Sequence, residues 1–309
     1  MSRAHHQSDA PLVTIGVPVY NGEAYLATAL DSLLQQDYPR LEIIIRDNAS
    51  TDQTSSICRA VAARDPRIRY LRNAENIGPL RNYCRLVEDA SGDYFMWAAD
   101  DDLHNSGFVE ALIQSLEAEP HAVLATPQTV PIDSSEKPLP LAVQPAAQAG
   151  SRMENVRRFF NPENPGWACD GWFYGLFRHA WLLKHARDQL AYRPWGGDLL
   201  WLFSILTAQD ITGNEKAELR KRVLPSSFQP TTWLQTSLFR HEMRVGFTRL
   251  CWQSDVTWHD KVRLQQMAWS WYSQSFFQRD RRVKTWLRGT RLTVLDALLS
   301  CYFPLRRLI

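Results

Sequence analysis

The stretch LVTIGVPVYNGEAYLATALDSLLQQDYPRLEIIIRD, Leu12 to Asp47, decides the fold class. Its two ends, residues 12–19 and 41–47, are short apolar runs rich in β-branched residues, which is typical of strands buried on both faces. Between them, apolar residues fall at the spacing that lets a helix bury one face: Leu26, Ala29, Leu30, Leu33 and Leu34. A strand, a helix and a second strand in this order predict two parallel strands joined by a crossover helix.

The same alternation continues to residue 126. Apolar runs at 68–71, 93–98 and 122–126 predict three further strands. Two helices are predicted from apolar spacing, one by Leu80, Tyr83, Cys84 and Val87 and the other by Val109, Leu112, Ile113 and Leu116. Ser50 and Gln53 form a possible capping box for the helix after the second strand. The pattern predicts a Rossmann-like α/β fold, with a mostly parallel sheet and helices on both faces.

The pattern changes after Thr126. Residues 127–150 contain five prolines, so we expect a long surface loop there. An aromatic segment, PGWACDGWFYGLFRHAWLL, follows at residues 165–183. From about Trp233 the chain is expected to be helical and is rich in Trp and Arg.

Composition narrows the class of protein. The 309 residues are 45% hydrophobic and 22% charged, which is typical of a folded globular chain. The polar opening predicts no secretory leader, and no apolar run is long enough to span a membrane. Five scattered cysteines without a CxxC pair favour buried or free thiols over a zinc or redox site.

Charge is unevenly distributed along the chain. Residues 233–309 hold 13 Lys and Arg against five Asp and Glu, a net charge of +8. Because the whole chain is +2, the first 232 residues carry −6. An acidic body is therefore followed by a basic tail.

Polar residues follow the predicted strands, at the edge where parallel sheets bind ligands. There is no GxGxxG after the first strand and no GxxxxGK[ST], which disfavours a Rossmann dehydrogenase and a P-loop enzyme. The fourth strand runs into Asp100, Asp101 and Asp102. Carboxylates at such a place suit Mg²⁺ or Mn²⁺ completed by phosphate and water, although an acidic triplet can also simply solvate a turn.

Three segments in order carry a resemblance to a known family. TIGVPVYNGEAYLATALDSLLQQDYPRLEIIIRDNASTD, NIGPLRN and GDYFMWAADDDL resemble the nucleotide-binding half of the family 2 glycosyltransferases, over residues 12 to about 120. The resemblance implies a GT-A fold, a nucleotide-activated sugar as donor, most often a UDP- or dTDP-sugar, and a divalent metal, Mn²⁺ or Mg²⁺.

The resemblance also implies site residues. The segment after the first strand and the DNASTD segment supply nucleotide contacts, with Asp47 reaching the base, and the NIGPLRN segment lies near the ribose and phosphates. The residues implied are Pro18, Tyr20, Asn21, Glu23, Asp47, Asn76, Gly78, Arg81 and Asn82. Individually, Asn21 could be a helix cap and Gly78 a turn residue.

The acidic motif departs from the family pattern. Ala99 stands where the first aspartate of the metal motif often lies, which leaves Asp101 and Asp102 as the implied metal ligands. Asp101 is also an implied donor contact. Asp100 falls on the variable position and is expected to point away from Asp101, as a bystander or supporting group at the donor site.

The second half is expected to supply the acceptor site and a catalytic base. Asp198 in PWGGDLLW lies where the family has an acidic pair, although Gly197 replaces the glutamate of that pair. We expect Asp198 to be the base, with Asp170 in reserve; alternatively, Asp198 caps the following helix. Trp167, Trp172 and Tyr174 could stack on sugar rings or belong to the core. No QxxRW motif of the processive members is present, which favours transfer of a single sugar.

The tail leaves two alternatives open. Residues 285–309 combine arginines with an amphipathic stretch that could lie on an anionic membrane, or could pack on the catalytic domain. Nucleic-acid binding is not expected, because no recognised module is present.

These expectations define a domain plan and a function. Residues 1–10 are expected to be disordered, 11–232 to form the GT-A domain, with a nucleotide-sugar half (11–126) and an acceptor half (127–232), and 233–309 to form a basic helical region. The expected function is inverting transfer of one sugar to a glycan or lipid-linked acceptor in surface polysaccharide synthesis. The expected location is cytoplasmic, with peripheral contact on the inner face of the plasma membrane as an option. The alternative is a non-catalytic nucleotide-sugar-binding or assembly component, suggested by Ala99 and Gly197.

Overall fold

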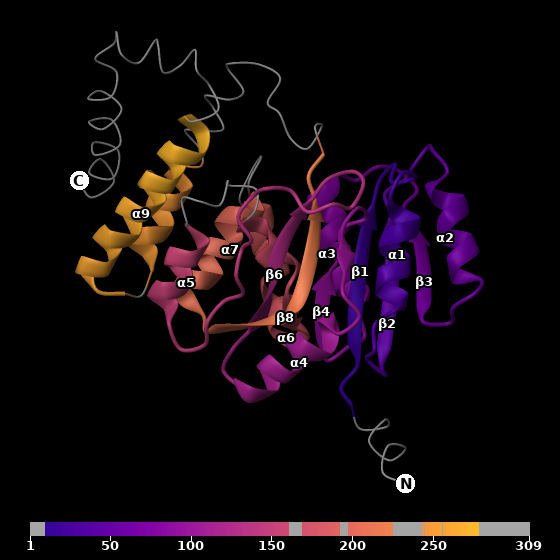
Figure 1. Ribbon diagram of the computed structural model, residues 1–309, viewed down its shortest axis with the longest axis horizontal. Coiled ribbons are helices and arrows are strands. Elements are labelled where there is room, and N and C mark those ends of the chain that lie inside the picture. The colour runs from indigo at the N-terminus through magenta and orange to yellow at the C-terminus, as the bar shows by residue number, and fades with distance from the viewer. Residues whose placement is uncertain are drawn as a thin grey trace.

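The computed structural model describes residues 10–160, 169–191, 197–224, 243, 245–254 and 256–277 (Figure 1). Predictions for residues 1–9 and for 278–309, which include the proposed membrane segment, lie outside the described residues.

The first half of the chain alternates strands and helices as predicted. Its elements are β1 (Val13–Val19), α1 (Leu26–Leu34), β2 (Leu41–Asp47), α2 (Thr54–Ala62), β3 (Ile68–Arg72), α3 (Pro79–Asp89), β4 (Tyr94–Trp97), β5 (Leu103–His104) and α4 (Phe108–Ala118). The four strands expected before residue 100 are confirmed to within two residues at each end. The short strand β5 was not predicted.

The second half mixes short helices with the remaining strands. Its elements are β6 (Leu124–Ile132), α5 (Arg152–Phe159), the 3₁₀ helix η1 (Cys169–Tyr174), β7 (Leu176–Arg178), α6 (His179–His185), the 3₁₀ helix η2 (Ala186–Ala191), α7 (Gly197–Ala208), β8 (Ile211–Arg222) and α9 (Trp258–Phe277). Residues 245–253 are also helical. Helices α9 and 245–253 lie together at the end of the molecule away from β3 (Figure 1).

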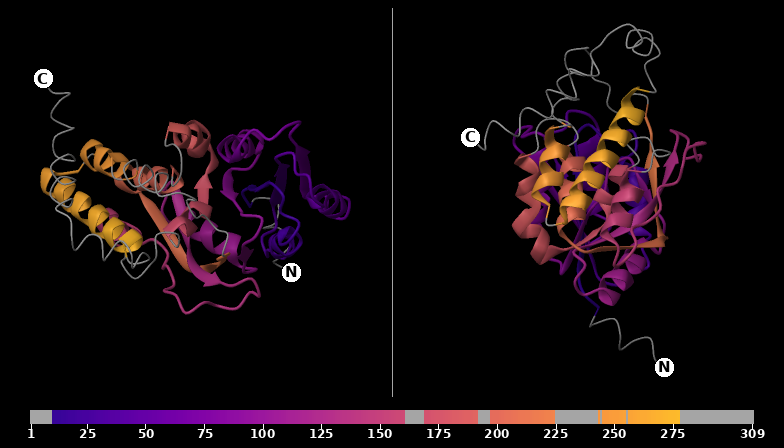
Figure 2. Two further views of the ribbon diagram at one scale, coloured as in Figure 1. Left: turned by 90° about the horizontal axis from the view of Figure 1, so that it is seen from above. Right: turned by 90° about the vertical axis from the view of Figure 1, so that its left-hand side faces the viewer.

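The described strands form one sheet in the order β3-β2-β1-β4-β7-β6-β8-β5. Strands β3, β2, β1, β4, β6 and β8 run in one direction, while β7 and β5 run against their neighbours. A mostly parallel sheet is therefore confirmed. The carboxyl ends of these parallel strands share the upper edge in Figure 1, which Figure 2 (left) shows from above.

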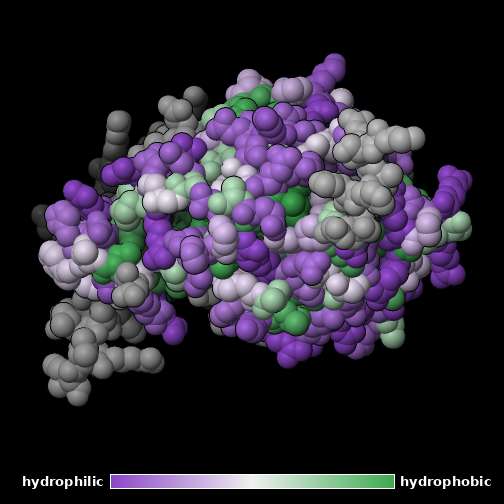
Figure 3. Space-filling view, turned by 90° about the horizontal axis from the view of Figure 1, so that it is seen from below, coloured by the Kyte–Doolittle hydropathy of each residue, from purple (hydrophilic) through white to green (hydrophobic). Residues whose placement is uncertain are grey.

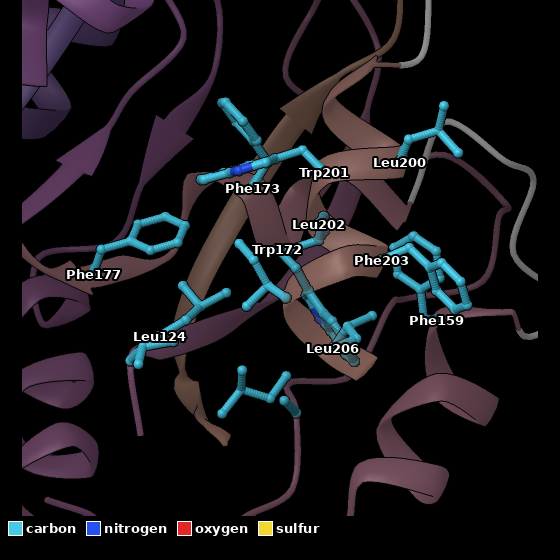
Figure 4. Close-up of a cluster of buried hydrophobic side chains, with 14 of the residues drawn as sticks. Leu124, Phe159, Trp172, Phe173, Phe177, Leu200, Trp201, Leu202, Phe203 and Leu206 are labelled. Atoms are coloured by element: carbon cyan, nitrogen blue, oxygen red, sulfur yellow. The ribbon is translucent and has the colours of Figure 1, made fainter. Parts of the chain in front are cut away.

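The core lies on both faces of this sheet because successive strand residues point to opposite faces. In β4, Tyr94 and Met96 join one buried cluster, and Phe95 and Trp97 join the other. The second cluster contains the aromatic residues of η1 and α7, which face one another in Figure 4. Trp97 and Phe173 stack there with ring centroids 4.7 Å apart.

The proline-rich segment corrects one prediction. Strand β6 continues through Pro127 and Pro131 to Ile132, and Gln144, Ala146 and Ala147 further on are buried. A strand tolerates proline where no ladder bond is lost, and here the register with β8 shifts between Pro127 and Gln128. The expected surface loop at 127–150 is thus in part a buried strand, and only its remainder is loop.

The capping-box prediction for α2 is also wrong. The helix begins at Thr54, whose N–H donates to Asp52 Oδ1 at 3.0 Å. Ser50 instead accepts a hydrogen bond from the Asn21 N–H at 2.9 Å. Its hydroxyl is therefore used between two loops rather than at the helix end.

Other general predictions can be compared with the described part of the chain. Cys58, Cys84 and Cys251 are buried free thiols, as expected. None of the helices described is both long and apolar enough to cross a bilayer. The face seen from below, away from the carboxyl ends of the parallel strands, is mainly hydrophilic with small scattered apolar spots (Figure 3).

Candidate active site

The loop after β1 is held against the loop after β2 by its polar residues. Asn21 adopts a positive φ of 54°, and its Oδ1 accepts a hydrogen bond from the Thr51 N–H at 2.9 Å. Glu23 Oε2 accepts from the Gln53 N–H at 2.9 Å. Pro18 is buried in β1. These contacts leave the Tyr20 ring 49% exposed at the sheet edge, where it can stack on a planar ligand.

Asp47 is buried and fully engaged inside the protein. Its Oδ1 accepts from the Ser50 N–H at 2.8 Å, and its Oδ2 accepts from the Tyr70 hydroxyl at 2.8 Å and from Arg72 Nη1 at 2.7 Å. Burial alone would raise the pKa of Asp47, but these hydrogen bonds and the charge of Arg72 hold it below its ordinary value. In this arrangement Asp47 orders the loop after β2, and its contact with a base stays a prediction.

Asparagine side chains connect the NIGPLRN segment, residues 76–82, to the end of β2 and to the loop after it. Asn76 Oδ1 accepts from Asn48 Nδ2 at 2.8 Å, and Asn82 Nδ2 donates to the Arg46 carbonyl at 3.0 Å. Gly78, with φ 83°, precedes α3, and Arg81 is exposed on the first turn of that helix. The segment is thus held by side-chain amides, while Arg81 faces solvent.

Asp100 lies against the loop after β1. A Cβ on Gly22 would overlap with Asp100 Oδ2, so the carboxylate packs directly on that backbone. Burial, then the negative charge of Asp101, raises the pKa of Asp100 to about 7, and Asp102 adds to the effect. Asp100 therefore connects the acidic motif to the predicted nucleotide loop, and its role at the donor site stays a prediction.

Asp102 and Asp101 are joined to the end of β8. Asp102 is 1% exposed, and its Oδ1 accepts from the Arg222 N–H at 2.7 Å. Arg222 Nε donates to the Asp101 carbonyl at 2.9 Å, and its guanidinium lies 4.3 Å from the centroid of the Tyr25 ring. This leaves the half-buried Asp101 side chain as the more accessible of the two carboxylates.

Lys221 is the charged residue that sequence reasoning missed. Its Nζ lies 3.8 Å from Asp102 Oδ2 and 5.0 Å from the centroid of the Tyr174 ring. Burial raises the pKa values of Asp101 and Asp102, to about 6 for Asp102. The charge of Lys221 is the largest effect that lowers each of these two pKa values. The sequence ELRKR shows alternation typical of a strand and ends in basic residues, but nothing in it indicates contact with the acidic motif.

Asp198 lies in the first turn of α7, one residue after the helix begins at Gly197. It is therefore not the residue that precedes the helix. Burial raises the pKa of Asp198, while a hydrogen bond from the Leu199 N–H and the charge of Lys221 lower it. A carboxylate with a raised pKa is a better proton acceptor, so the environment suits a general base. Asp170 belongs to η1, and its side chain lies outside the described part.

The aromatic residues near η1 divide between core and site. Trp172 is fully buried, and its Nε1 donates to the Pro145 carbonyl at 3.0 Å, so it belongs to the core. Tyr174 is half-buried beneath Lys221. Trp167 lies outside the described residues.

The acidic motif has a donor set that fits a divalent cation. The buried Asp102 Oδ2 has no hydrogen-bond partner, and burial, followed by the negative charge of Asp101, raises the pKa of Asp100. No group of three or more His, Cys, Asp or Glu able to hold a metal occurs among the described residues. Asp101 and the adjacent Asp102, whose Oδ2 is buried without a hydrogen-bond partner, fit the mode in which Mg²⁺ or Mn²⁺ takes one or two carboxylates and completes its shell with phosphate and water.

The mostly parallel sheet, with its polar loops at the carboxyl edge, has the architecture of the GT-A fold, and sequence comparison identifies the family. Residues 14–182 match the family model described as "Glycosyl transferase family 2". The chain belongs to this family. The predicted family membership is confirmed.

Curated relatives match over part of their length. The chain is 31% identical over 106 residues to the glycosyltransferase GlyG of Streptococcus pneumoniae, covering 34% of this chain and 35% of GlyG. It is 34% identical over 105 residues to the GalNAc(5)-diNAcBac-PP-undecaprenol beta-1,3-glucosyltransferase of Campylobacter jejuni, covering 34% of each. The chain thus spans about a third of the length of these relatives.

Solved structures support the GT-A fold. TarS residues 1–349 of S. aureus, in complex with UDP-GlcNAc, superpose with a TM-score of 0.65 at 17% identity, covering 86% of this chain and 73% of TarS. The mannosyltransferase PcManGT of Pyrobaculum calidifontis, in complex with GDP-Man and Mn²⁺, gives 0.54 at 16% identity, covering 97% and 84%. At such identities the likeness establishes the fold alone.

Proposed function

We propose that the protein transfers a single sugar, with inversion, from a nucleotide-diphosphate sugar to a hydroxyl of a glycan or lipid-linked acceptor. The observation that carries the proposal is the position of Lys221 relative to two groups of carboxylates. Its Nζ lies 3.8 Å from Asp102 Oδ2 of the acidic motif, and its positive charge also acts on Asp101 and on Asp198 of α7. One group is suited to the diphosphate side of a donor, and the other to an acceptor hydroxyl.

Different residues bind the donor and accept the proton. Tyr20 stacks on the nucleotide base, and the loops held by Asn21 and Glu23 enclose the ribose and phosphates. Asp198 accepts the proton of the acceptor hydroxyl as its oxygen bonds to the anomeric carbon. The bond between that carbon and the diphosphate oxygen breaks, and its electron pair leaves with the nucleoside diphosphate.

Asp101 and Asp102 would hold a divalent cation. When bound, the cation supplies positive charge that offsets the charge developing on the diphosphate. PcManGT was solved with Mn²⁺, which supports Mn²⁺ or Mg²⁺ here. Comparing Asp101→Asn with Asp100→Asn tests this assignment: we expect the Asp101 variant to lose far more Mn²⁺-dependent turnover. The opposite order would show that the register of the motif is shifted by one.

A donor screen tests the function itself. The protein is incubated with Mn²⁺, a panel of UDP-, dTDP- and GDP-sugars and candidate lipid-linked acceptors, and release of nucleoside diphosphate is measured. Turnover of one donor is expected. If no donor is turned over while UDP still binds, the alternative of a non-catalytic binding component is favoured. Ala99 and Gly197, which stand where the family has acidic residues, give that alternative its basis.

Asp198→Asn tests the base. We expect the turnover number to fall about 10²–10⁴-fold with UDP affinity unchanged, because only proton transfer is removed. Asp210→Asn, an exposed carboxylate two residues beyond α7, is the matched control. Undiminished turnover in the Asp198 variant would remove it from the base role.

The setting of the reaction is proposed from the relatives. The C. jejuni relative is named for an undecaprenol-linked substrate, which supports a lipid-linked acceptor in surface polysaccharide synthesis. We place the protein in the cytoplasm, with residues 285–309 contacting the inner face of the plasma membrane. Within the chain, residues 11–126 form the nucleotide-sugar half and 127–232 the acceptor half.

A further inference from the structure

Lys221 is an unusual lysine for a soluble protein. Its side chain is only 14% exposed, although burying an ammonium group is costly unless opposite charge surrounds it. It lies near the end of β8, at the carboxyl edge where the acidic motif and the loop after β1 also lie. Lys221 therefore belongs to the candidate active site and not to the protein surface.

Carboxylates from two parts of the chain supply that opposite charge to Lys221. Asp102 Oδ2 lies 3.8 Å from Nζ, beyond hydrogen-bond distance, and is the buried oxygen that has no hydrogen-bond partner. Asp198, from α7, also experiences the positive charge of Lys221. The positive charge of Lys221 thus acts both on the carboxylates assigned to the leaving group and on the carboxylate assigned to the acceptor.

The adjacent arginine has a different role. Arg222 is 4% exposed, and its guanidinium donates to the carbonyls of Asp101, Asp133 and Ser134. These hydrogen bonds from the Arg222 guanidinium hold in place the loops that contain Asp101, Asp133 and Ser134. Because alternate strand residues point to opposite sides, Lys221 and Arg222 are directed to different surroundings. The charges of both residues act on Asp101 and Asp102, and the charge of Lys221 has the larger effect at each.

We propose that Lys221 binds the diphosphate of the donor, and that its ammonium is sufficient for a nucleoside diphosphate to bind without a divalent cation. This inference rests on the proposed function, because it names a second source of positive charge for the same leaving group. A lysine ammonium is a compact charge with three hydrogen-bond donors, which suits phosphate oxygens from several directions. In the transfer, Lys221 donates hydrogen bonds to the departing diphosphate and gives up no proton.

Binding of nucleotides in EDTA tests this proposal. Calorimetry compares UDP, UMP and uridine, and dTDP with dTMP, on the wild type and on Lys221→Met. The wild type is expected to prefer UDP to UMP by about tenfold or more without cation, the equivalent of about 1.4 kcal/mol. Lys221→Met should lose that preference while binding uridine as before, and Lys221→Arg should keep most of it.

Controls separate a loss of charge from a loss of folding. Lys216→Met removes an exposed lysine from the same strand and should bind like the wild type. If Lys221→Met is unstable, the double variant Lys221→Met with Asp102→Asn removes both charges of the pair and should fold while still lacking the preference. Circular dichroism and the melting temperature monitor the fold in each variant.

The outcomes distinguish the two proposals. A Lys221→Met variant that prefers UDP over UMP as the wild type does would overturn the role of Lys221. A wild type that binds UDP only when Mn²⁺ is present would also overturn it, and would leave the transferase proposal standing. A wild type that binds no nucleoside diphosphate of the panel, with or without Mn²⁺, would overturn the proposed function itself.

Discussion

At the scale of single residues, Asp47 shows a structural role that its sequence motif does not reveal. Its two oxygens receive three hydrogen bonds from within the protein, while its predicted contact with a base stays a prediction. The residue types of the motif are visible in the sequence, but the partners Tyr70 and Arg72 come from β3 and cannot be read from the motif.

Asp47→Asn should therefore destabilise the fold and change its response to acid. Removing one charge from a buried, fully bonded group is expected to lower the free energy of unfolding by about 2–4 kcal/mol at pH 7. The pKa of Asp47 lies below its ordinary value in the folded state, so its contribution is present above pH 3.8 and is lost as pH falls below that value. Urea unfolding at pH 5 and pH 3 should show the smaller difference between wild type and variant at pH 3.

The matched control is Asp31→Asn, which removes an exposed carboxylate from α1. It should leave both unfolding curves within about 0.5 kcal/mol of the wild type. Equal destabilisation of the Asp47 variant at both pH values would contradict the charge-based explanation.

Gly22 gives a second test at this scale. A methyl group there would overlap with Asp100 Oδ2 and crowd Val19 Cγ2, so Gly22→Ala should displace the Asp100 carboxylate. We expect a loss of about 1–3 kcal/mol in stability from overpacking, and weaker UDP binding because the loop after β1 moves with it. Gly107→Ala, where nothing lies within 4 Å of the added carbon, should change neither quantity. UDP affinity and urea unfolding are measured on both variants. Equal results for the two variants would contradict the predicted contact between position 22 and Asp100.

At the scale of elements, the sequence correctly predicted the strands and helices that depend on apolar spacing within a single segment. Strands β1 to β4 and helices α1, α3 and α4 follow from apolar spacing within each segment. Strands β5 and β7 are only two and three residues long, and they depend on partners more than 50 residues away in the chain. Lys221 was missed for the same reason, since β8 reaches the acidic motif only through this long-range pairing.

The junction between β8 and the acidic motif should be sensitive to Arg222. Arg222→Met leaves the carbonyls of Asp101, Asp133 and Ser134 without this donor, so we expect a loss of about 3 kcal/mol and a more mobile acidic motif. Hydrogen exchange measured by mass spectrometry should show faster exchange over residues 99–104. Arg59→Met on the exposed face of α2 is the control and should change neither stability nor exchange. Unchanged exchange at the motif would show that Arg222 does not hold it.

At the scale of the whole molecule, the distribution of charge along the chain bears on the proposed contact with a membrane. Residues 1–232 carry a net charge of −6, so attraction to an anionic bilayer must come from the basic region after them. Residues 285–309 contain four arginines and one aspartate among leucines and aromatic residues. At about 1 kcal/mol per basic residue near an anionic surface, this segment alone could supply roughly 4 kcal/mol.

Truncation after residue 284 should therefore abolish flotation with vesicles that contain phosphatidylglycerol. The full chain is expected to float at low salt and to be released at about 0.5 M salt, because screening shortens the reach of exposed charges. Vesicles of phosphatidylcholine alone are the control for charge, and unchanged UDP binding shows that the truncated protein is folded. A variant with glutamine at 288, 291, 306 and 307 should float less than the full chain but more than the truncated one, since its apolar residues remain. If the truncated chain floats as well as the full one, the segment has no membrane role, and packing of the tail on the catalytic domain becomes the better explanation.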